Sequence, residues 1–223
     1  MSTEGKHGAV AETFHLDPPA EQAARRRAQL IRVVAHLVVT QGVDAVSHAS
    51  VAELAGCARS LVYRYFPQRA DLLYALLAEF EDELNKRFSF DDVIAGVLGK
   101  KDDGPVEVSA ERREFVEQLW AAEDWEPPTL EFRLACVILM RDSSLNTVLG
   151  SHRVELQESM ERRLIGPLRS LGLTQIEAWI VVDAMLSVMH HVTRAVWAGE
   201  ATPDEAVELL MTVSSRVLQT FTE

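Results

Sequence analysis

The sequence predicts an all-α protein in which an N-terminal three-helix head is joined to a larger helical body. Apolar residues recur at three- and four-residue intervals along most of the chain, which is the spacing of amphipathic helices. Glycine and proline divide these patterns into pieces of helical length. The two shortest pieces lie between Ser47 and Arg69 and are separated at Ala55–Ala58, an arrangement typical of a helix-turn-helix.

Composition places the chain among ordinary soluble globular proteins, since 48% of its 223 residues are apolar and 25% are charged. Cys57 and Cys136 are the two cysteines, and their separation favours neither a disulfide framework nor a zinc site. The polar, proline-broken start is not a secretory signal, and no apolar run approaches the ~18 residues of a membrane span. We therefore expect a cytoplasmic protein without a membrane partner.

The head is predicted to contain three helices. Residues 1–19 are expected to form a disordered arm, and Glu21–Gln41 an amphipathic helix that ends at Gly42. The hydroxyl of Ser47, or alternatively of Ser50, can cap the second helix. A phosphate contact by Ser47 at the same helix end is an equally good interpretation.

The third helix follows a glycine corner, where Gly56 can adopt the left-handed conformation that ends a helix. Arg59, Ser60, Tyr63 and Arg64 then crowd guanidinium, hydroxyl and phenol donors onto one short segment. Such donors suit phosphates and base edges, so this segment is the predicted recognition helix.

The segment from Val51 to Leu73, VAELAGCARSLVYRYFPQRADLL, resembles the DNA-binding signature of the TetR family of transcriptional regulators. The matching features are the Ala55-Gly56 corner, the run from Tyr63 to Phe66, the basic Arg69 and the leucine pair that follows. Cys57, Ala58 and Arg64 depart from the usual pattern, and loss of a cap hydroxyl at Ala58 is expected to weaken the third helix by about 1 kcal/mol.

The resemblance implies a DNA-binding domain at residues 20–69 and an effector-binding and dimerisation domain at residues 70–223. It implies that two copies present their recognition helices to a palindromic double-stranded DNA site. We expect Ser60, Leu61 and Arg64 near base edges. We expect Arg59, Tyr63 and Arg69 near phosphates. Packing is as good an interpretation of Tyr63 as contact.

The charge distribution agrees with a DNA partner at one end of the molecule. The whole chain has a formal net charge of −12. Residues 20–70 nevertheless hold seven arginines against three acidic residues, a local charge of +4, whereas residues 71–223 carry −14. A basic head on an acidic body directs only the head toward phosphate. The run Arg25–Arg27 can equally be a solvated surface.

The body is predicted to contain several longer helices. Pro67 opens one that carries apolar residues from Leu73 to Phe88 and so joins the head to the body. A tilt of this helix would move the recognition helix, which would link an effector to DNA. Short helices are expected between Phe90 and Trp120, and Thr129 is expected to cap a helix that ends at Arg141.

Three further helices complete the predicted body. His152–Leu171 contains Gly166-Pro167 as a kink, and Thr174–Ala198 is apolar on nearly every side. Pro203–Phe221 carries a cleaner apolar stripe. Since the last two helices cannot cover each other completely, we expect a homodimer through residues 174–221, as the resemblance also implies.

The resemblance implies that the body binds a small-molecule effector. Because the body is rich in aromatic and methionine side chains, we expect the effector pocket to be apolar. Most of these side chains are expected to be plain core. Asp183 with His190 and His191 does not amount to a metal site, so we expect neither metal nor cofactor. The candidate lining residues are Trp120, Phe132, Met140, Trp179, Asp183, Met185, Met189 and His190.

Other function classes find less support. The sequence holds no nucleophile elbow, zinc-protease, phosphate-loop or dinucleotide motif, so an enzyme is not expected. A helical protein-interaction module that no longer binds DNA is disfavoured by the retained Arg59, Arg64 and Arg69. Repression is the expected mode because a bound dimer blocks polymerase by occupancy alone, although activation remains an alternative.

Overall fold

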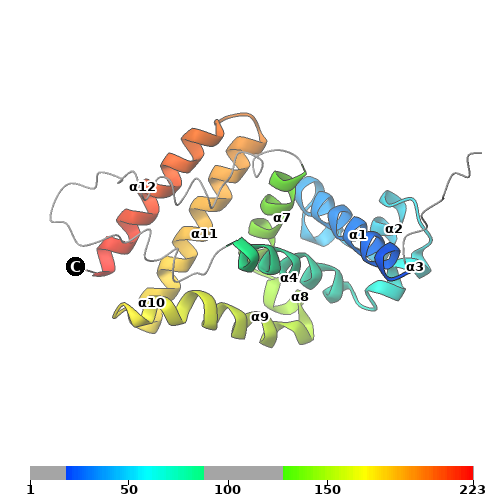
Figure 1. The fold of residues 1–223 in the computed structure, drawn as a ribbon, viewed down its shortest axis with the longest axis horizontal. Coiled ribbons are helices and arrows are strands. Elements are labelled where there is room, and N and C mark those ends of the chain that lie inside the picture. The colour runs from blue at the N-terminus through cyan, green and yellow to red at the C-terminus, as the bar shows by residue number, and fades with distance from the viewer. Residues whose placement is uncertain (1–18, 88–127, 223) are drawn as a thin grey trace, which may run out of the picture.

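The computed structural model describes residues 19–87 and 128–222, and within these ranges every regular element is a helix (Figure 1). The all-α prediction is confirmed. The elements are α1 (Pro19–Gln41), η1 (Val43–Ala45), α2 (His48–Leu54), α3 (Arg59–Tyr65), α4 (Arg69–Arg87), α7 (Thr129–Arg141), α8 (Leu145–Val148), η3 (Gly150–His152), α9 (Arg153–Met160), η4 (Glu161–Ile165), α10 (Gly166–Ser170), α11 (Gln175–Trp197) and α12 (Pro203–Thr222).

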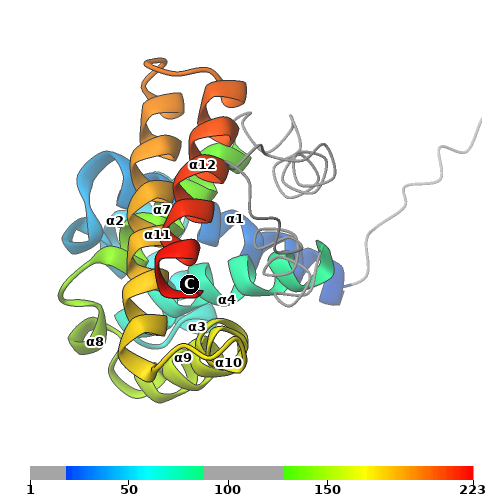
Figure 2. The same ribbon diagram turned by 90° about the vertical axis from the view of Figure 1, so that its left-hand side faces the viewer.

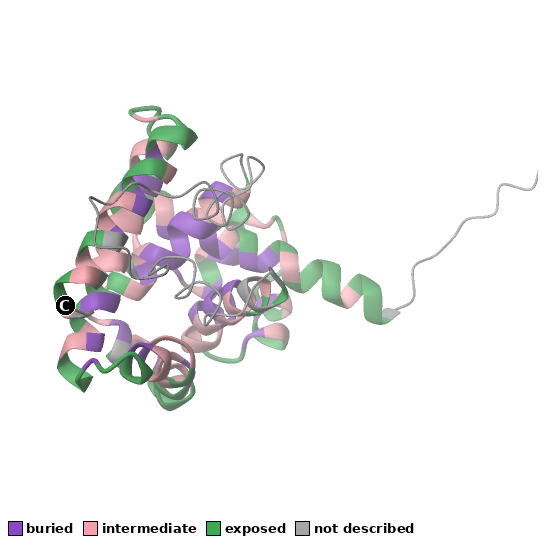
Figure 3. Cartoon of the chain, turned by 60° about the vertical axis from the view of Figure 1, so that its left-hand side comes forward, coloured by how far each residue is buried: buried purple, intermediate pink, exposed green. Residues whose placement is uncertain are grey.

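Helix α1 begins exposed and becomes buried toward its end. Its first turns point away from the rest of the molecule, where Figure 3 colours them as exposed. From Leu30 onward the apolar stripe expected from the sequence is buried. Gly42, with a φ of +88°, ends the helix at the position expected from the sequence.

One buried cluster is shared by the head and the first part of the body. Buried residues of α1, α2 and α3 pack in the same cluster as residues of α4 and α7. The members include Leu30, Val34, Val51, Val62, Phe66, Leu72, Leu73, Leu76, Cys136 and Leu139. Because this apolar surface is removed from water jointly, the head does not have a core of its own. The boundary at residues 69/70 stays a prediction.

Helix α4 leaves the head and runs into the body, while α7 lies against α1 and α4 (Figure 1). A polar contact accompanies the packing of α1 on α7, since His36 Nδ1 lies 2.7 Å from Glu131 Oε1. The head is therefore joined to the body at two places. Helix α1 packs on α7, and the chain itself continues from the head into α4.

The start of α7 differs from the expectation. Thr129 is the first helical residue rather than the cap, and the cap position is occupied by Pro128, which makes no side-chain hydrogen bond to the helix. Proline sits readily at a helix start because it has no N–H that would need an intrahelical partner. The carbonyl of Pro128 accepts a hydrogen bond from the N–H of Phe132 (3.1 Å), so the helix begins one residue earlier than expected.

The expected helix His152–Leu171 is divided into η3, α9, η4 and α10. The segment η4 is a π-helical turn that ends directly before Gly166-Pro167. A proline inside a helix lacks an N–H and crowds the carbonyl of the preceding turn, which a wider turn accommodates. The expected irregularity at Gly166-Pro167 is thus a widened turn.

Helices α11 and α12 stand side by side at the end of the body far from the head (Figures 1 and 2). A capping box in which Thr174 and Glu177 bond each other's backbone N–H groups begins α11. Although the two helices pack together, several large apolar side chains on them stay exposed to solvent: Ile176, Ile180, Trp197 and Leu209.

Two sets of expectations lie outside the described residues: the disordered arm, apart from Pro19, and the short helices between Phe90 and Trp120. None of the helices in the described ranges is long and apolar enough to cross a bilayer by itself. Gly150–Ser170 and Gln175–Trp197 reach that length and composition only when combined across a bend of 115°.

Candidate nucleic-acid interface

The corner between α2 and α3 is closed by backbone hydrogen bonds around Gly56. The N–H of Cys57 donates to the carbonyl of Ala52 (3.0 Å), and the N–H of Gly56 donates to that of Glu53 (3.2 Å). Gly56 has a φ of +61°, the left-handed conformation that this Schellman pattern requires. The corner predicted from Ala55-Gly56 is present, with the geometry that favours glycine.

Helix α2 begins with reciprocal hydrogen bonds between two serines. Ser47 Oγ accepts from the N–H of Ser50 (3.1 Å), and Ser50 Oγ accepts from the N–H of Ser47 (2.9 Å). Ser50 also donates to the carbonyl of Ala45 (2.7 Å). Ser47 therefore has the capping role, and a phosphate contact by its half-buried hydroxyl stays a prediction.

Helix α3 separates its side chains between core and solvent. Val62 is fully buried, and Leu61 is half-buried at the edge of the helix. The remaining predicted contact residues of α3 are exposed together: Arg59, Ser60, Tyr63 and Arg64. Two guanidinium groups and two hydroxyls thus lie on the solvent side of one short helix, where they can donate to phosphate or base-edge acceptors.

Tyr63 is held by a neighbour on α2 that sequence reasoning missed. The rings of Tyr63 and His48 stack with their centroids 3.9 Å apart and an interplanar angle of 9°. His48 is buried, and its Nε2 lies 2.7 Å from the carbonyl oxygen of Phe66 at the end of α3. Tyr63 therefore both packs against His48 and remains 43% exposed, so its ring is restrained but still accessible to solvent.

Arginine side chains lie over aromatic rings at both ends of α3. The guanidinium carbon of Arg59 is 5.8 Å from the ring centroid of Tyr63, and that of Arg64 is 5.5 Å from the centroid of Tyr65. Such cation–π contacts restrain flexible side chains without using their N–H donors. Both guanidinium groups thus keep hydrogen-bonding capacity toward solvent.

Arg69 lies differently from the other predicted contact residues. Its Nε donates to the carbonyl of Val46 and its Nη2 to that of Val43, each at 2.8 Å, and Nη2 also lies 3.8 Å from Asp44 Oδ1. These bonds join the start of α4 to the segment between α1 and α2. A phosphate contact by Arg69 would require them to be exchanged, so we expect this residue to position the head.

The run Arg25–Arg27 lies on the exposed part of α1, and its members have different partners. Arg25 pairs with Glu21 (2.8 Å) and Arg26 donates to Gln29 (2.9 Å). The guanidinium of Arg27 lies 3.7 Å from Glu79 and 5.5 Å from the ring centroid of Phe66. Arg27 thus contributes to the contact between α1 and α4, whereas its two neighbours remain on the surface.

The candidate effector residues are not gathered in one cavity within the described ranges. Phe132 and Met140 pack against the cluster shared with the head. Trp179 and Met185 pack against a second cluster formed by residues from η4 to α11. Met189 packs against a third cluster that joins α7, α11 and α12. The side chain of Asp183 is 81% exposed, and Trp120 lies outside the described residues.

Among the candidates that the structure describes, His190 has a buried, unsatisfied polar atom. Its Nδ1 is buried without a hydrogen-bond partner, as is Oγ1 of Thr193 one turn later on α11. Burial lowers the pKa of His190, and the nearby His191, Arg141 and Arg194 lower it further, so the neutral imidazole is favoured. A neutral ring can either donate or accept a hydrogen bond, depending on its tautomer.

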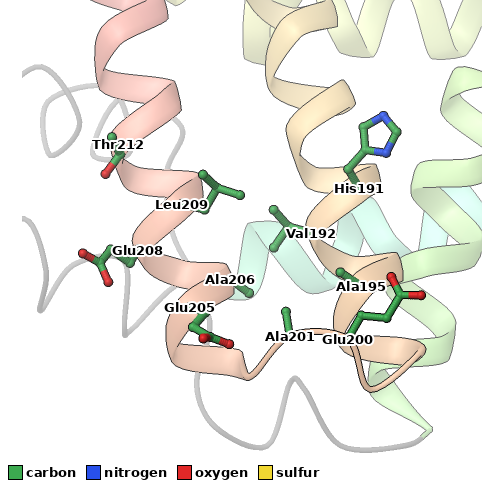
Figure 4. Close-up of a pocket in the computed structure, with 10 residues that line it drawn as sticks. All are labelled: His191, Val192, Ala195, Glu200, Ala201, Glu205, Ala206, Glu208, Leu209 and Thr212. Carbon is green, nitrogen blue, oxygen red and sulfur yellow. The ribbon is translucent and has the colours of Figure 1, made fainter.

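A groove of about 690 Å³ between α11 and α12 contains none of the predicted effector residues, although its lining lies within the predicted dimer segment 174–221 (Figure 4). Val192, Ala195 and Ala206 form part of its apolar lining. Carboxylates of Glu200, Glu205 and Glu208 also line it. The apolar stripe of the last predicted helix marked Ala206 and Leu209, whereas nothing in the sequence singled out the three glutamates as lining residues.

The first comparison with known proteins concerns the head. Residues 30–76 match the family model for bacterial regulatory proteins of the tetR family. Over an alignment of 94 residues the chain is 30% identical to the nucleoid occlusion factor SlmA of Mannheimia succiniciproducens. That match covers 36% of this chain and 44% of the relative, so the chain spans less than half the length of this curated protein.

The fold of the whole described chain also has a counterpart. A crystal structure from Rhodococcus sp., described as a TetR-family transcriptional regulator, superimposes with a TM-score of 0.54. The alignment covers 87% of this chain and 99% of the other at 17% sequence identity. This likeness concerns the fold, an all-helical body that follows a helix-turn-helix head.

A missing cap on α3 gives the first testable prediction. Ala58 occupies the N-cap position in an extended conformation, is exposed, and makes no side-chain cap bond. Ala58→Ser should supply the acceptor and raise the free energy of unfolding by about 1 kcal/mol in chemical denaturation. Ala58→Val, which adds bulk without an acceptor, should give no such gain. Equal stability of the two variants would contradict the missing-cap explanation.

Proposed function

Because residues 30–76 match the model of the tetR family of bacterial regulatory proteins, we propose that this chain is a TetR-family DNA-binding transcriptional regulator of the cytoplasm. It acts as a repressor that binds a palindromic operator as a dimer and is released by a small, largely apolar effector. The observation that carries the proposal is the exposed set Arg59, Ser60, Tyr63 and Arg64 on a helix held by a Schellman corner. A regulatory family agrees with the expectation that the chain is not an enzyme.

The packing of the buried side of α3 supports the proposed DNA contact. Val62 and Phe66 anchor the helix in the shared core, and His48 restrains Tyr63. The exposed donors therefore sit on a rigid base, which limits the side-chain and backbone freedom lost on binding. Arg64 near a base edge and Arg59 near a phosphate is the arrangement we propose, with Ser60 and Leu61 beside Arg64.

The dimer is supported by apolar surface that the chain leaves exposed on α11 and α12. Ile176 is 72% exposed and Ile180, one turn later on the same face, is 49% exposed. Leu209 on α12 is 51% exposed and lines the groove between the two helices. Packing against the same helices of a second copy would remove this surface from water and form a four-helix interface.

The DNA proposal predicts different effects for two arginines of α3. In mobility-shift titrations with DNA that flanks the protein's own coding region, Arg64→Ala should weaken binding about tenfold and relax sequence preference. Arg59→Ala should weaken binding to all sequences alike and lower the salt slope by about one.

The matched control for these variants is Arg162→Ala, since Arg162 is exposed in η4. It should leave affinity, preference and salt slope unchanged. The proposal fails if the wild-type protein binds no DNA at low salt, or if Arg162→Ala weakens binding as much as Arg59→Ala.

The dimer proposal predicts a monomer when charge is placed on the exposed face of α11. Ile180→Glu should shift the sedimentation coefficient from that of a dimer to that of a monomer, because an interface cannot desolvate an unpaired carboxylate cheaply. Val154→Glu on α9 changes an equally exposed valine (54%) and should leave the dimer intact. A wild-type monomer at micromolar concentration contradicts the proposal.

The effector proposal predicts that the body can retain a small molecule. We expect native mass spectrometry of the purified protein to reveal a bound mass, and the molecule extracted from it to lower DNA affinity when added back. His190→Phe should reduce this response, since the unsatisfied Nδ1 is a polar anchor for such a ligand. Absence of any bound mass, together with no response to small-molecule extracts of the host cell, would contradict an effector.

A further inference from the structure

The first turn of α4 makes polar contacts both with the head and with the body. Arg69 holds the carbonyls of Val43 and Val46 in the head. Two residues later, Asp71 Oδ2 accepts from the N–H of Gln68 (2.7 Å), which caps α4, and Asp71 Oδ1 lies 2.7 Å from His152 Nε2. His152 belongs to η3 in the body. One helical turn therefore joins the recognition-helix side of the molecule to the body.

The surroundings of His152 select its charged form. Its second ring nitrogen, Nδ1, lies 3.2 Å from Glu155 Oε2, and its ring stacks on Tyr74 with centroids 4.2 Å apart at 3°. Ionised carboxylates only accept hydrogen bonds, and a neutral imidazole has only one N–H to donate. Both contacts can therefore be made at once only by the imidazolium, which pairs with two carboxylates.

We propose that His152 is a positioning residue for DNA binding, whose imidazolium clamps the first turn of α4 to the body and thereby sets the direction of the recognition helix. The inference rests on the proposed function, since it needs α3 to bind DNA. It adds a polar contact, that of His152 with Asp71 and Tyr74, to the apolar packing that joins the head to the body.

The connection from Asp71 back to α3 is short and stiff. The carbonyl of Phe66 is held by His48 (2.7 Å), and the ring of Pro67 fixes its own φ. Arg69 adds its two bonds to the head. A displacement of the first turn of α4 is therefore transmitted to α3 rather than absorbed between them. A clamped turn should favour DNA binding because less freedom remains to be lost.

Further along α4, a second set of contacts holds the helix to the body independently of His152. Arg163 Nε lies 3.0 Å from Glu81 Oε1, and Ser159 Oγ donates to the same carboxylate. Loss of the His152 contact should thus release the first turn while the rest of α4 stays in place. This separation distinguishes a positioning role from a general contribution to folding.

Protonation of His152 gives the clamp a pH dependence. Burial lowers the pKa of His152, but the hydrogen bonds and charges of Asp71 and Glu155 outweigh it, and the pKa is raised above its ordinary value. Tyr74 of α4 also faces it, and the pKa of Tyr74 is raised by burial, by its hydrogen bond to Glu155 and by the charges of Glu155 and Glu81.

The sign of the pH effect follows from that shift. A histidine with a raised pKa in the folded state contributes stability fully below its unfolded pKa of about 6.5, and this contribution is lost as pH rises through the folded pKa. The clamp should therefore be more fully closed at about pH 6 than at about pH 8.5.

The existence of the clamp can be tested on the full chain without DNA. Side-chain ¹⁵N spectra of histidine-labelled protein should give His152 a titration midpoint above about 6.5. The free energy of unfolding of His152→Gln should be lower than that of wild type, and this difference should be larger at about pH 6 than at about pH 8.5. A midpoint at or below about 6.5, or a pH-independent difference, would overturn the clamp.

Its role in DNA binding is tested with a duplex selected from a random pool by the wild-type protein. By fluorescence anisotropy, the advantage of wild type over His152→Gln should shrink at least about threefold between about pH 6 and pH 8.5. Arg162→Gln is the control for loss of a positive charge on the body, because Arg162 is exposed in η4. It should keep the wild-type profile.

Each outcome of the DNA measurement decides something. Parallel pH profiles of wild type and His152→Gln, or tighter binding by His152→Gln at about pH 6, overturn the positioning role. If selection yields no duplex, the proposed function itself fails and the DNA role of His152 fails with it. The spectra and unfolding data then still report whether the contact between His152 and Asp71 exists.

Discussion

Leu30 of α1, Leu73 of α4 and Leu139 of α7 lie in one buried cluster, and most of the molecule is arranged by that packing. The head lacks enough helices to enclose its own apolar surface, so α4 and α7 complete it. Burial of that surface orients α3 as well, because Val62 and Phe66 belong to the same cluster. The exposed donors of α3 therefore face solvent as a consequence of what the opposite side of the helix buries.

Much of this arrangement could be predicted from local patterns. The apolar period of α1 and α4 gave their buried faces, and Gly42 and Gly56 marked turns that have positive φ in the structure. These signals are local because a helix period and a left-handed glycine depend on neighbouring residues only. The same locality explains the error at Thr129, where Pro128 was an equally local but competing signal.

The parts that could not be predicted are contacts between residues distant in sequence. Arg69 bonds carbonyls 23 and 26 residues away, and His152 meets Asp71 across 81 residues. His48 is buried under Tyr63 although histidine is not a typical core residue. Such pairs arise when helices are brought together by their apolar faces, so they become visible only after the packing is known.

The glycine at the corner of the helix-turn-helix illustrates what selection can act upon. A Cβ at Gly56 would meet no atom within 4 Å, so no neighbour requires the absence of a side chain there. Only the backbone conformation, with its φ of +61°, disfavours other residues. Asparagine at this position would therefore cost little conformational free energy during evolution. A β-branched residue would strain the turn, although it would clash with no neighbouring atom.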